Sequence, residues 1–544
     1  MKGLAERLER PAMVALQSVA GGEDGGLYAK KPLRIPRTNV ADLFPSRVIA
    51  GVRPSAAGAG EWVEILNSGE EAIEGIEVVA SIPGFTVEGP TESGPRLLSG
   101  EAARVPISLG FERDKLREHD QNLTTFMELS LRYRVGDFVV QDRLRRPVTL
   151  YHRNALTWAD PNAVASFVTA TSDSVQTVAR RLSQAIPEAS RADALSLPVG
   201  IFAYLSQLAY ATDPVSPFGS DVIDYIQYPV QTISRGAGDC DDLAVLFAAL
   251  AEAVGLPTLL LTTPGHIFVA VPTGRPAHSL ETGIRETGMS LMEYDGRLWL
   301  PLDTSLVDRS FEEAWTRGAK LVADSTRLRK LGVIDVRAAW ATHPPVDLSP
   351  SHEVVASQMP EVATKVSDGA QKARVRFQRE LGTLLAAVEG EAARRPDDFS
   401  MLNRRGIVLV ALGRLDEASS SFRRSVELGA SEPGPSNNLG NLLLLGGNAV
   451  EALHWYDEAL ELARTEEEVR RRIVLNRLLA AWMLDPAGSR FLELVLGAND
   501  DDLRAFYQGV NGGPLRGGAN AEDPSSVASI SASDVPVDRL VHWL

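Results

Sequence analysis

The C-terminal third of the chain contains an internal period of 34 residues, which limits its possible folds more than any other feature. Two glycines, an alanine and an aromatic residue recur in one register: Gly406, Gly413, Ala418 and Phe422 reappear as Gly440, Gly447, Ala452 and Tyr456. Each of these residues could separately be an ordinary packing residue, but four matches in one register are not expected by chance. Self-similarity at such a period is typical of stacked repeats, because one unit alone cannot bury its apolar face. Residues 372–495 are therefore predicted to form a solenoid.

This period resembles the tetratricopeptide repeat, whose helix pairs place small residues at the helix crossing and an aromatic residue in the gap. The resemblance implies an all-α solenoid over 372–495. Pro396 falls where a preceding repeat would end, so Lys372–Arg394 is expected to supply an earlier helix. Arg470–Leu484 is expected to form a degenerate third unit or a cap. Stacked helix pairs form a concave groove that commonly receives peptides, so a protein partner is expected there.

The single cysteine, Cys240, lies in the run Gly238-Asp239-Cys240-Asp241-Asp242, and an apolar helix is predicted to begin directly after it. A helix start offers unpaired backbone N–H groups and a positive dipole end, which favour a thiolate and could hold an oxyanion. An isolated cysteine in an intracellular chain is most often a buried apolar residue, but such a cysteine seldom has three carboxylates beside it. These carboxylates oppose thiolate formation unless they point away or cap the helix. Cys240 is therefore a candidate nucleophile.

Two further candidates follow Cys240 in the chain, in the order base and then orienting carboxylate. His266 precedes the apolar run 267–271, and Asp303 follows the apolar run 298–302, so both border predicted strands. His266 could instead be a core histidine, and Asp303 could be a turn residue. Pro264 and Gly265 favour a turn that delivers the imidazole at the start of its strand. As the third member of a triad with Cys240 and His266, Asp303 would fix the imidazole tautomer and stabilise the imidazolium.

Two further features of the sequence bear on these candidates. Asp295 and Asp308 lie close enough in sequence to replace Asp303. The segment from about Thr273 to Met292 is rich in glycine and proline and is expected to form a loop over the cleft.

The runs GDCDDLAVLFAALAEAVGLPT, PGHIFVAV and WLPLDTS together resemble the transglutaminase-like superfamily, relatives of papain-type cysteine enzymes. The resemblance implies an α+β core over 156–330 with Cys240 as nucleophile, His266 as general base and Asp303 as orienting carboxylate. It also suggests Gln227 as a side-chain oxyanion donor beside the Cys240 backbone N–H. A polar strand or turn residue is the alternative interpretation of Gln227.

The expected chemistry is attack of the thiolate on a protein or peptide amide, through a thioester intermediate. Water as the acceptor makes the protein a protease or deamidase, and a lysine amine makes it a crosslinking transglutaminase. Excluding water would need a dry, aromatic-lined tunnel, which the sequence does not reveal, so hydrolysis is favoured. A catalytically inactive binding scaffold is the alternative from another class.

The rest of the chain divides by composition. Residues 1–47 are predicted to be a loosely ordered lead, and 48–155 an antiparallel sandwich of immunoglobulin-like type, from short alternating segments separated by turns. Helices are expected over Val175–Ile186 and from about Ala192 to Tyr210, beside the Cys240 helix. Four prolines mark 331–371 as a linker, and 496–544 is predicted to be a flexible tail.

Charge and cysteine content exclude several function classes. A formal charge of -16 and a pI near 5.1 disfavour nucleic-acid binding and favour basic or neutral protein substrates. One cysteine excludes disulfides within the chain and multi-cysteine metal clusters, and no histidine pair has ligand spacing, so no metal or cofactor is expected. The acidic run around Cys240 also lacks the spacing of a calcium loop.

The sequence also bears on membranes and location. No apolar run approaches the roughly 18 residues of a membrane span, and Met1–Gly22 is a poor signal peptide. A cytoplasmic location is expected, and export is the alternative if a removed segment precedes this sequence.

Overall fold

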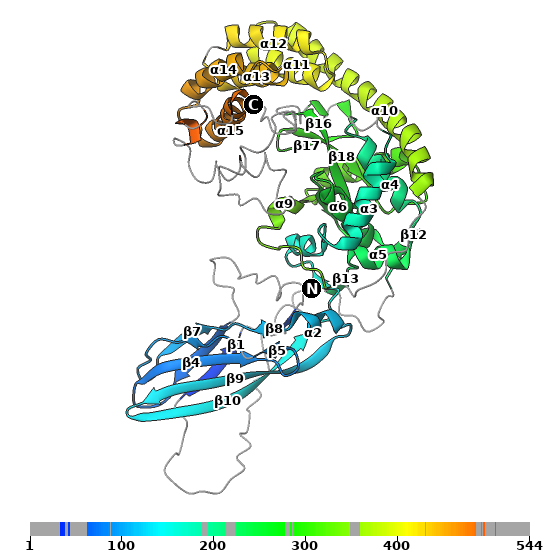
Figure 1. The fold of residues 1–544 in the computed structure, drawn as a ribbon. Coiled ribbons are helices and arrows are strands. Elements are labelled where there is room, and N and C mark those ends of the chain that lie inside the picture. Colours follow the sequence, from blue (N-terminus) through cyan, green and yellow to red (C-terminus); the bar gives the residue numbers. More distant parts are fainter. Residues whose placement is uncertain are drawn as a thin grey trace, which may run out of the picture.

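A computed structural model describes residues 33–38, 42–43, 62–87, 89–187, 193–213, 223–277, 283–284, 287–348, 359–429, 431–485, 491, 493–495 and 506. These residues form an N-terminal β region, a central region of sheet and helices, and a C-terminal helical region, arranged along an arc (Figure 1). The prediction of a multidomain chain that combines sheets with a helical C-terminal region is confirmed. Among the described helices, none combines the length and apolar character needed to cross a membrane.

The N-terminal β region contains two larger sheets. One has the strand order β1 (Leu33–Thr38), β3 (Trp62–Asn67), β7 (Ala102–Pro106), and the other has the order β2 (Asp42–Leu43), β10 (Phe138–Leu150), β9 (Leu123–Val135), β4 (Ile73–Ser81), β6 (Glu92–Ser93). A small pair, β5 (Thr86–Val87) and β8 (Gly110–Phe111), and helix α2 (Arg113–Glu118) complete the region. Alternate residues of β3 and β4, among them Val63, Ile65 and Val78, are fully buried in one hydrophobic cluster. This period of two is what a strand with one buried face requires.

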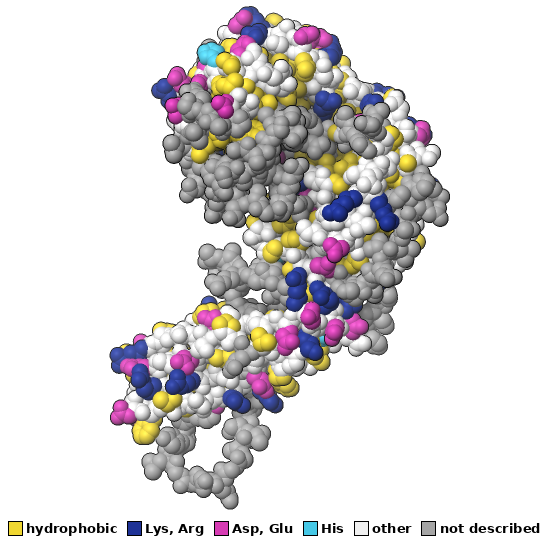
Figure 2. Space-filling model, in the orientation of Figure 1, with side chains coloured by type: hydrophobic (Ala, Val, Ile, Leu, Met, Phe, Trp, Pro, Cys, Tyr) yellow, Lys and Arg dark blue, Asp and Glu magenta, His cyan; other side chains and the backbone are white. Residues whose placement is uncertain are grey.

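The charged side chains of this region are mixed in sign on the face that Figure 2 shows. Arg132 lies 3.1 Å from Glu77, and Arg145 lies 2.6 Å from Glu128, across neighbouring strands. The described residues of this face therefore form no continuous basic stripe of the kind that binds phosphate backbones.

Two strands lie within the predicted N-terminal lead, 1–47. β1 pairs antiparallel with β3, and β2 pairs parallel with the end of β10. Leu33 and Ile35 are buried at 5% and 7% exposure, so their alternation drives this segment onto the sheet. Pro36 is tolerated because β1 is an edge strand and its register shifts between Arg34 and Arg37. The remainder of 1–47 lies outside the described residues.

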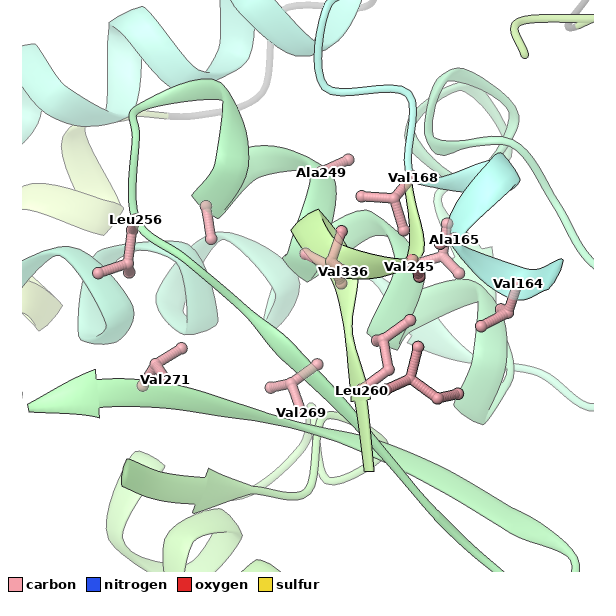
Figure 3. Packing of buried hydrophobic residues seen from close by; sticks show 14 of the residues in the cluster. Val164, Ala165, Val168, Val245, Ala249, Leu256, Leu260, Val269, Val271 and Val336 are labelled. Atoms are coloured by element: carbon pink, nitrogen blue, oxygen red, sulfur yellow. The ribbon is translucent and has the colours of Figure 1, made fainter. Parts of the chain in front are cut away.

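The central region is built on a five-stranded antiparallel sheet. Its order is β17 (Met292–Tyr294), β18 (Arg297–Leu302), β16 (His266–Pro276), β15 (Leu259–Thr263), β19 (Gly332–Asp335). Helix α6 (Cys240–Ala253) packs on this sheet and is buried almost throughout. Figure 3 shows Val245 and Ala249 of α6 in one hydrophobic cluster with Leu260 of β15 and Val269 of β16. A helix that is apolar on all sides is expected in such a core.

Helices and short strand pairs surround α6. They are η1 (Pro161–Phe167), α3 (Asp173–Ala185), α4 (Ser196–Leu205), α5 (Pro229–Arg235) and α8 (Phe311–Arg327), with the pairs β11 (Ala155–Thr157) with β13 (Ile223–Tyr225) and β12 (Ala209–Tyr210) with β14 (Ala237–Gly238). The second predicted helix, Ala192 to Tyr210, is therefore shorter than expected and ends at Leu205. Tyr210 lies on a strand instead.

The predicted linker, 331–371, is largely structured. β19 adds to the central sheet beside β15, helix α9 (Val336–Ala339) follows it, and helix α10 (Met359–Arg394) begins within the linker. Ile334 and Val336 are buried at 3% and 0% exposure, which explains why this segment joins the core. Pro360 falls in the first turn of α10, where a missing backbone N–H costs nothing. Residues 349–358 lie outside the described part of the chain.

The C-terminal region consists of helices that pack in sequence order. They are α11 (Phe399–Ala411), α12 (Leu415–Leu428), α13 (Pro433–Leu445), α14 (Ala449–Leu462) and α15 (Glu467–Leu484). The 34-residue period has a direct cause, because a Cβ atom at Gly440 would lie 2.7 Å from Tyr456 Cε1 and Gly406 faces Phe422 in the same way. The predicted tail, 496–544, lies outside the described residues except for Phe506, which is buried against Phe491.

Helix α10 connects the two regions physically. Its N-terminal part packs on α4, α3 and α8 of the central region, and α10 also packs on α11. Arg376 lies over the Trp315 ring at 4.0 Å and donates to the backbone oxygen of Glu312 and to the Ser290 hydroxyl. The C-terminal helices are therefore anchored to the element that follows β18.

Candidate active site

Cys240 is the first residue of α6, and the turn before it determines that position. Gly236 ends α5 in the left-handed conformation at φ 68°, and β14 then leads to Asp239, the N-cap of α6. A side chain at Gly238 would collide with Asp242, whose Cβ would lie 2.6 Å from the added atom. Cys240 is partly buried, so its thiol is neither sealed in the core nor fully exposed. Its backbone N–H lies at the helix start, where no intrahelical acceptor is available.

His266 and Asp303 come together because β16 and β18 are neighbours. His266 starts β16 directly after Gly265, whose φ of 74° closes the hairpin with β15. The antiparallel register places Leu302 opposite Val269, so the end of β18 lies beside the start of β16. The Nε2 atom of His266 is 3.1 Å from Asp303 Oδ1. His266 and Asp303 are therefore neighbours in the fold, although they are distant in the sequence.

Cys240 lies close enough to the same imidazole to raise its pKa. Because Nε2 is bonded to Asp303, Nδ1 is the ring nitrogen left to face Cys240. Burial acts to lower the pKa of His266, but hydrogen bonds to Asp303 and Cys240 outweigh it and raise that pKa to about 9. Protonated imidazole beside sulfur stabilises a thiolate. The three predicted triad residues thus form one connected group.

Asp303 is held in place by its own surroundings. The backbone N–H and the hydroxyl of Ser305 donate to Asp303 Oδ1 at 3.2 and 2.7 Å, and Arg317 Nε lies 3.8 Å from Oδ2. Burial acts to raise the pKa of Asp303, but hydrogen bonds from His266 and Ser305 lower it below the ordinary value. This carboxylate is therefore ionised and oriented when the imidazole is charged.

The two alternative carboxylates have other positions. Asp295 lies in the turn between β17 and β18 and faces Arg472 at 3.7 Å. Asp308 is largely exposed beside Arg309. The structure thus brings Asp303, and neither of these two, to His266.

Gln227 does not present a free amide to the site. Its backbone N–H donates to Asp242 Oδ1 at 2.7 Å, and its side-chain Nε2 donates to Asp242 Oδ2 and, at 3.4 Å, to the Ala237 carbonyl. Both amide hydrogens are used in this way. The predicted oxyanion role is therefore at odds with this geometry, and the pairing with Asp242 fixes the start of α6 instead.

The carboxylates around Cys240 differ in their roles. Asp239, Asp241 and Asp242 each place an oxygen within 4.8 Å of the others, the kind of group that can hold a cation. Burial raises the pKa of Asp241 far above the ordinary value, and a hydrogen bond with Asp239 adds to the shift. Asp242 caps the helix start by accepting the Asp239 backbone N–H at 3.3 Å. A protonated Asp241 carries no negative charge that would oppose a thiolate at Cys240.

Three residues near the triad have no role at the site that the sequence predicts. Ser305 had a local signal, because a hydroxyl two residues after Asp303 is typical of a turn. Arg317 and Tyr210 had none, since their distance from the site in sequence hides their position. Tyr210 was expected on a helix.

No known protein-family model matches the chain, and no curated protein sequence matches it.

Proposed function

We propose that this protein is a cysteine-dependent amidohydrolase of the transglutaminase-like superfamily, with Cys240 as nucleophile. The observation that carries the proposal is that His266 Nε2 lies 3.1 Å from Asp303 Oδ1, while Cys240 lies close enough to the same imidazole to raise its pKa. A nucleophile, a base and an orienting group in contact are the arrangement that thiol acyl transfer needs.

The mechanism follows from this arrangement. His266 takes the Cys240 proton, and Sγ bonds to the carbonyl carbon of a protein or peptide amide. The backbone N–H of Cys240 donates to the resulting oxyanion. The carbon–nitrogen bond then breaks, and the nitrogen leaves as ammonia or an amine with the proton from the imidazolium. His266 next deprotonates a water, whose attack breaks the thioester and returns the proton to sulfur.

The flanking regions would recruit the substrate under this proposal. We propose that the N-terminal sheets form an immunoglobulin-like sandwich and that α10 to α15 form tetratricopeptide repeats that bind a protein partner. The repeat interpretation is supported by Gly406 and Gly440, each of which faces the aromatic residue of its own helix pair. The anchoring of α10 on α8 would connect partner binding to the region around Asp303.

Acylation of the thiol tests the proposal directly. Purified protein is mixed with 4-nitrophenyl acetate, and nitrophenol release is followed together with the intact mass of the protein. We expect an acetyl thioester in the wild type, none in Cys240→Ala, and strongly slowed acylation in His266→Ala. Asp308→Ala is the matched control for Asp303→Ala and is expected to behave as wild type.

The amide reaction is tested on dimethylcasein by ammonia release and by peptide cleavage, with and without a primary amine. Ammonia release or cleavage in water supports the hydrolase. Incorporation of the amine in preference to water would favour the transglutaminase alternative, and unchanged acylation in Cys240→Ala would favour a scaffold.

A further inference from the structure

The strand β12 places Tyr210 beside the segment that leads to Cys240. Tyr210 is the register partner of Gly238, two residues before the nucleophile. The Ala209 N–H donates to the Gly236 carbonyl at 2.9 Å, and the Ala211 N–H donates to the Gly238 carbonyl at 3.0 Å. These flanking bonds fix the backbone of Tyr210 against the start of α6.

The backbone of Tyr210 lies beside Gly238, and the charges of Cys240 and Asp303 act on its phenol. Burial raises its pKa, and the charges of Cys240, Asp239, Asp241 and Asp303 raise it further. The phenol therefore remains protonated at working pH and can act as a hydrogen-bond donor. Tyr210 is also 46% exposed, so the ring borders the solvent side of the site. Within the described residues its hydroxyl has no protein hydrogen-bond partner.

A cysteine acyl transfer needs a second donor for the oxyanion besides the Cys240 backbone N–H. Gln227 is engaged with Asp242 and Ala237, so its amide does not supply that donor. The donor has to be a neutral or positive group close to Cys240 and accessible to a substrate carbonyl. Tyr210 is the candidate, because its phenol is neutral, its backbone pairs with Gly238 two residues before Cys240, and its side chain is 46% exposed.

We infer that Tyr210 is a further catalytic residue, whose hydroxyl donates to the oxyanion formed when Cys240 attacks a carbonyl. This inference rests on the proposed cysteine mechanism. A neutral phenol suits the acidic surroundings of the thiol, because it donates a hydrogen bond next to the carboxylates without adding charge. No bond forms or breaks at Tyr210, and its proton stays on the phenol oxygen throughout.

The test compares Tyr210→Phe with Tyr225→Phe in the full chain. Tyr225 lies on β13, and its hydroxyl accepts a bond from Arg235 at 3.0 Å, so it is a matched tyrosine outside the triad. Two reactions of Cys240 are measured: acylation by 4-nitrophenyl acetate, which forms an oxyanion, and alkylation by iodoacetamide, which does not.

We expect Tyr210→Phe to slow acylation by roughly 100-fold, the lower end of the range for lost oxyanion donors. Alkylation should change by less than about twofold, because the thiolate and His266 are untouched. Tyr225→Phe should leave both rates unchanged. Circular dichroism of each variant checks that the fold is retained.

Two outcomes would overturn the inference: acylation by Tyr210→Phe at the wild-type rate, or acylation and alkylation that fall by the same factor. The second outcome would assign Tyr210 to the ionisation of the thiol. A failure of the proposed function looks different, because then the wild type and Cys240→Ala acylate equally.

Discussion

His266 Nε2 lies 3.1 Å from Asp303 Oδ1, although the two residues are separated by 37 positions in the chain. The contact is made by two ends of neighbouring strands, so its geometry depends on the register of β16 with β18. The contacts of His266 with Asp303 and Cys240 favour the charged imidazole. The activity of the site is therefore expected to have an upper pH limit.

Amide hydrolysis should fall as the pH rises through about 9, the raised pKa of His266. Above this value the imidazole is neutral and cannot protonate the leaving nitrogen. The stabilisation that His266 gives the fold has the same sign: it is complete below about 6.5, the ordinary pKa of histidine, and is lost through about 9.

Asp303→Asn should move this limit towards lower pH, because it removes a negative charge and a charge-assisted hydrogen bond from the imidazolium. The measurement is ammonia release from dimethylcasein across the pH range, with Asp308→Asn as control. An upper limit that stays in place in Asp303→Asn would contradict the assignment of the limit to His266.

The sequence predicts the three candidate residues because each has a local signal. Cys240 precedes an apolar helix, and His266 and Asp303 border apolar strands. The sequence alone does not distinguish Asp303 from Asp295 and Asp308, since all three are close in the chain and only the strand register separates them.

The predictions that differed from the structure depended on contacts between distant segments. The papain-like resemblance suggests an oxyanion role for Gln227, and nothing in the sequence indicates its pairing with Asp242. Tyr210 was placed on a helix, since its apolar neighbours continue the helical pattern and the two-residue strand β12 is defined only by its partner β14. β1 was missed for the same reason, because its partner β3 lies well downstream.

Arg337→Ala should destabilise the central region strongly. Glu252 of α6 is 0% exposed and accepts from Arg337 Nε at 2.8 Å and from the Thr258 N–H at 2.8 Å. Removing the arginine leaves a buried carboxylate without its charge partner, at a cost of about 3–5 kcal/mol. The readout is urea unfolding followed by tryptophan fluorescence.

The loss of stability in Arg337→Ala should be smaller in mild acid than at neutral pH. Burial already raises the pKa of Glu252 to about 7, so protonation can remove the unpaired charge. The double variant Glu252→Gln/Arg337→Ala should recover part of the stability. Equal losses at both pH values would indicate that packing, and not charge, carries the effect.

Gly440→Ala should destabilise the C-terminal helices, because the new Cβ would lie 2.7 Å from Tyr456 Cε1. Overpacking of this kind costs about 1–3 kcal/mol. Gly382→Ala on α10 is the matched control, since nothing lies within 4 Å of its added Cβ. That control should gain about 0.5–1 kcal/mol from helix propensity. Thermal unfolding by circular dichroism compares the two, and effects of equal sign would contradict the packing explanation of the repeat period.

Arg376→Ala should loosen α10 from the central region. In addition to its contact with Trp315, Arg376 Nη1 donates to the Glu312 carbonyl at 3.0 Å and to the Thr316 hydroxyl at 2.8 Å. Losing these bonds and the ring contact should cost about 2 kcal/mol or more. Hydrogen exchange should accelerate in 287–290 and in the first turns of α8, whereas Arg379→Ala, at an exposed position of the same helix, should exchange as wild type.

The same variant also tests whether α8 helps to position Asp303. Arg317 extends from α8 to within 3.8 Å of Asp303 Oδ2, and the Asp303 N–H donates to the Ala314 carbonyl at 3.1 Å. A loosened α8 should therefore reduce Cys240 acylation several-fold without abolishing it, because His266 and Ser305 still hold Oδ1. Faster exchange in α8 with wild-type acylation would show that the anchoring of α10 stabilises the fold and leaves the orientation of Asp303 unchanged.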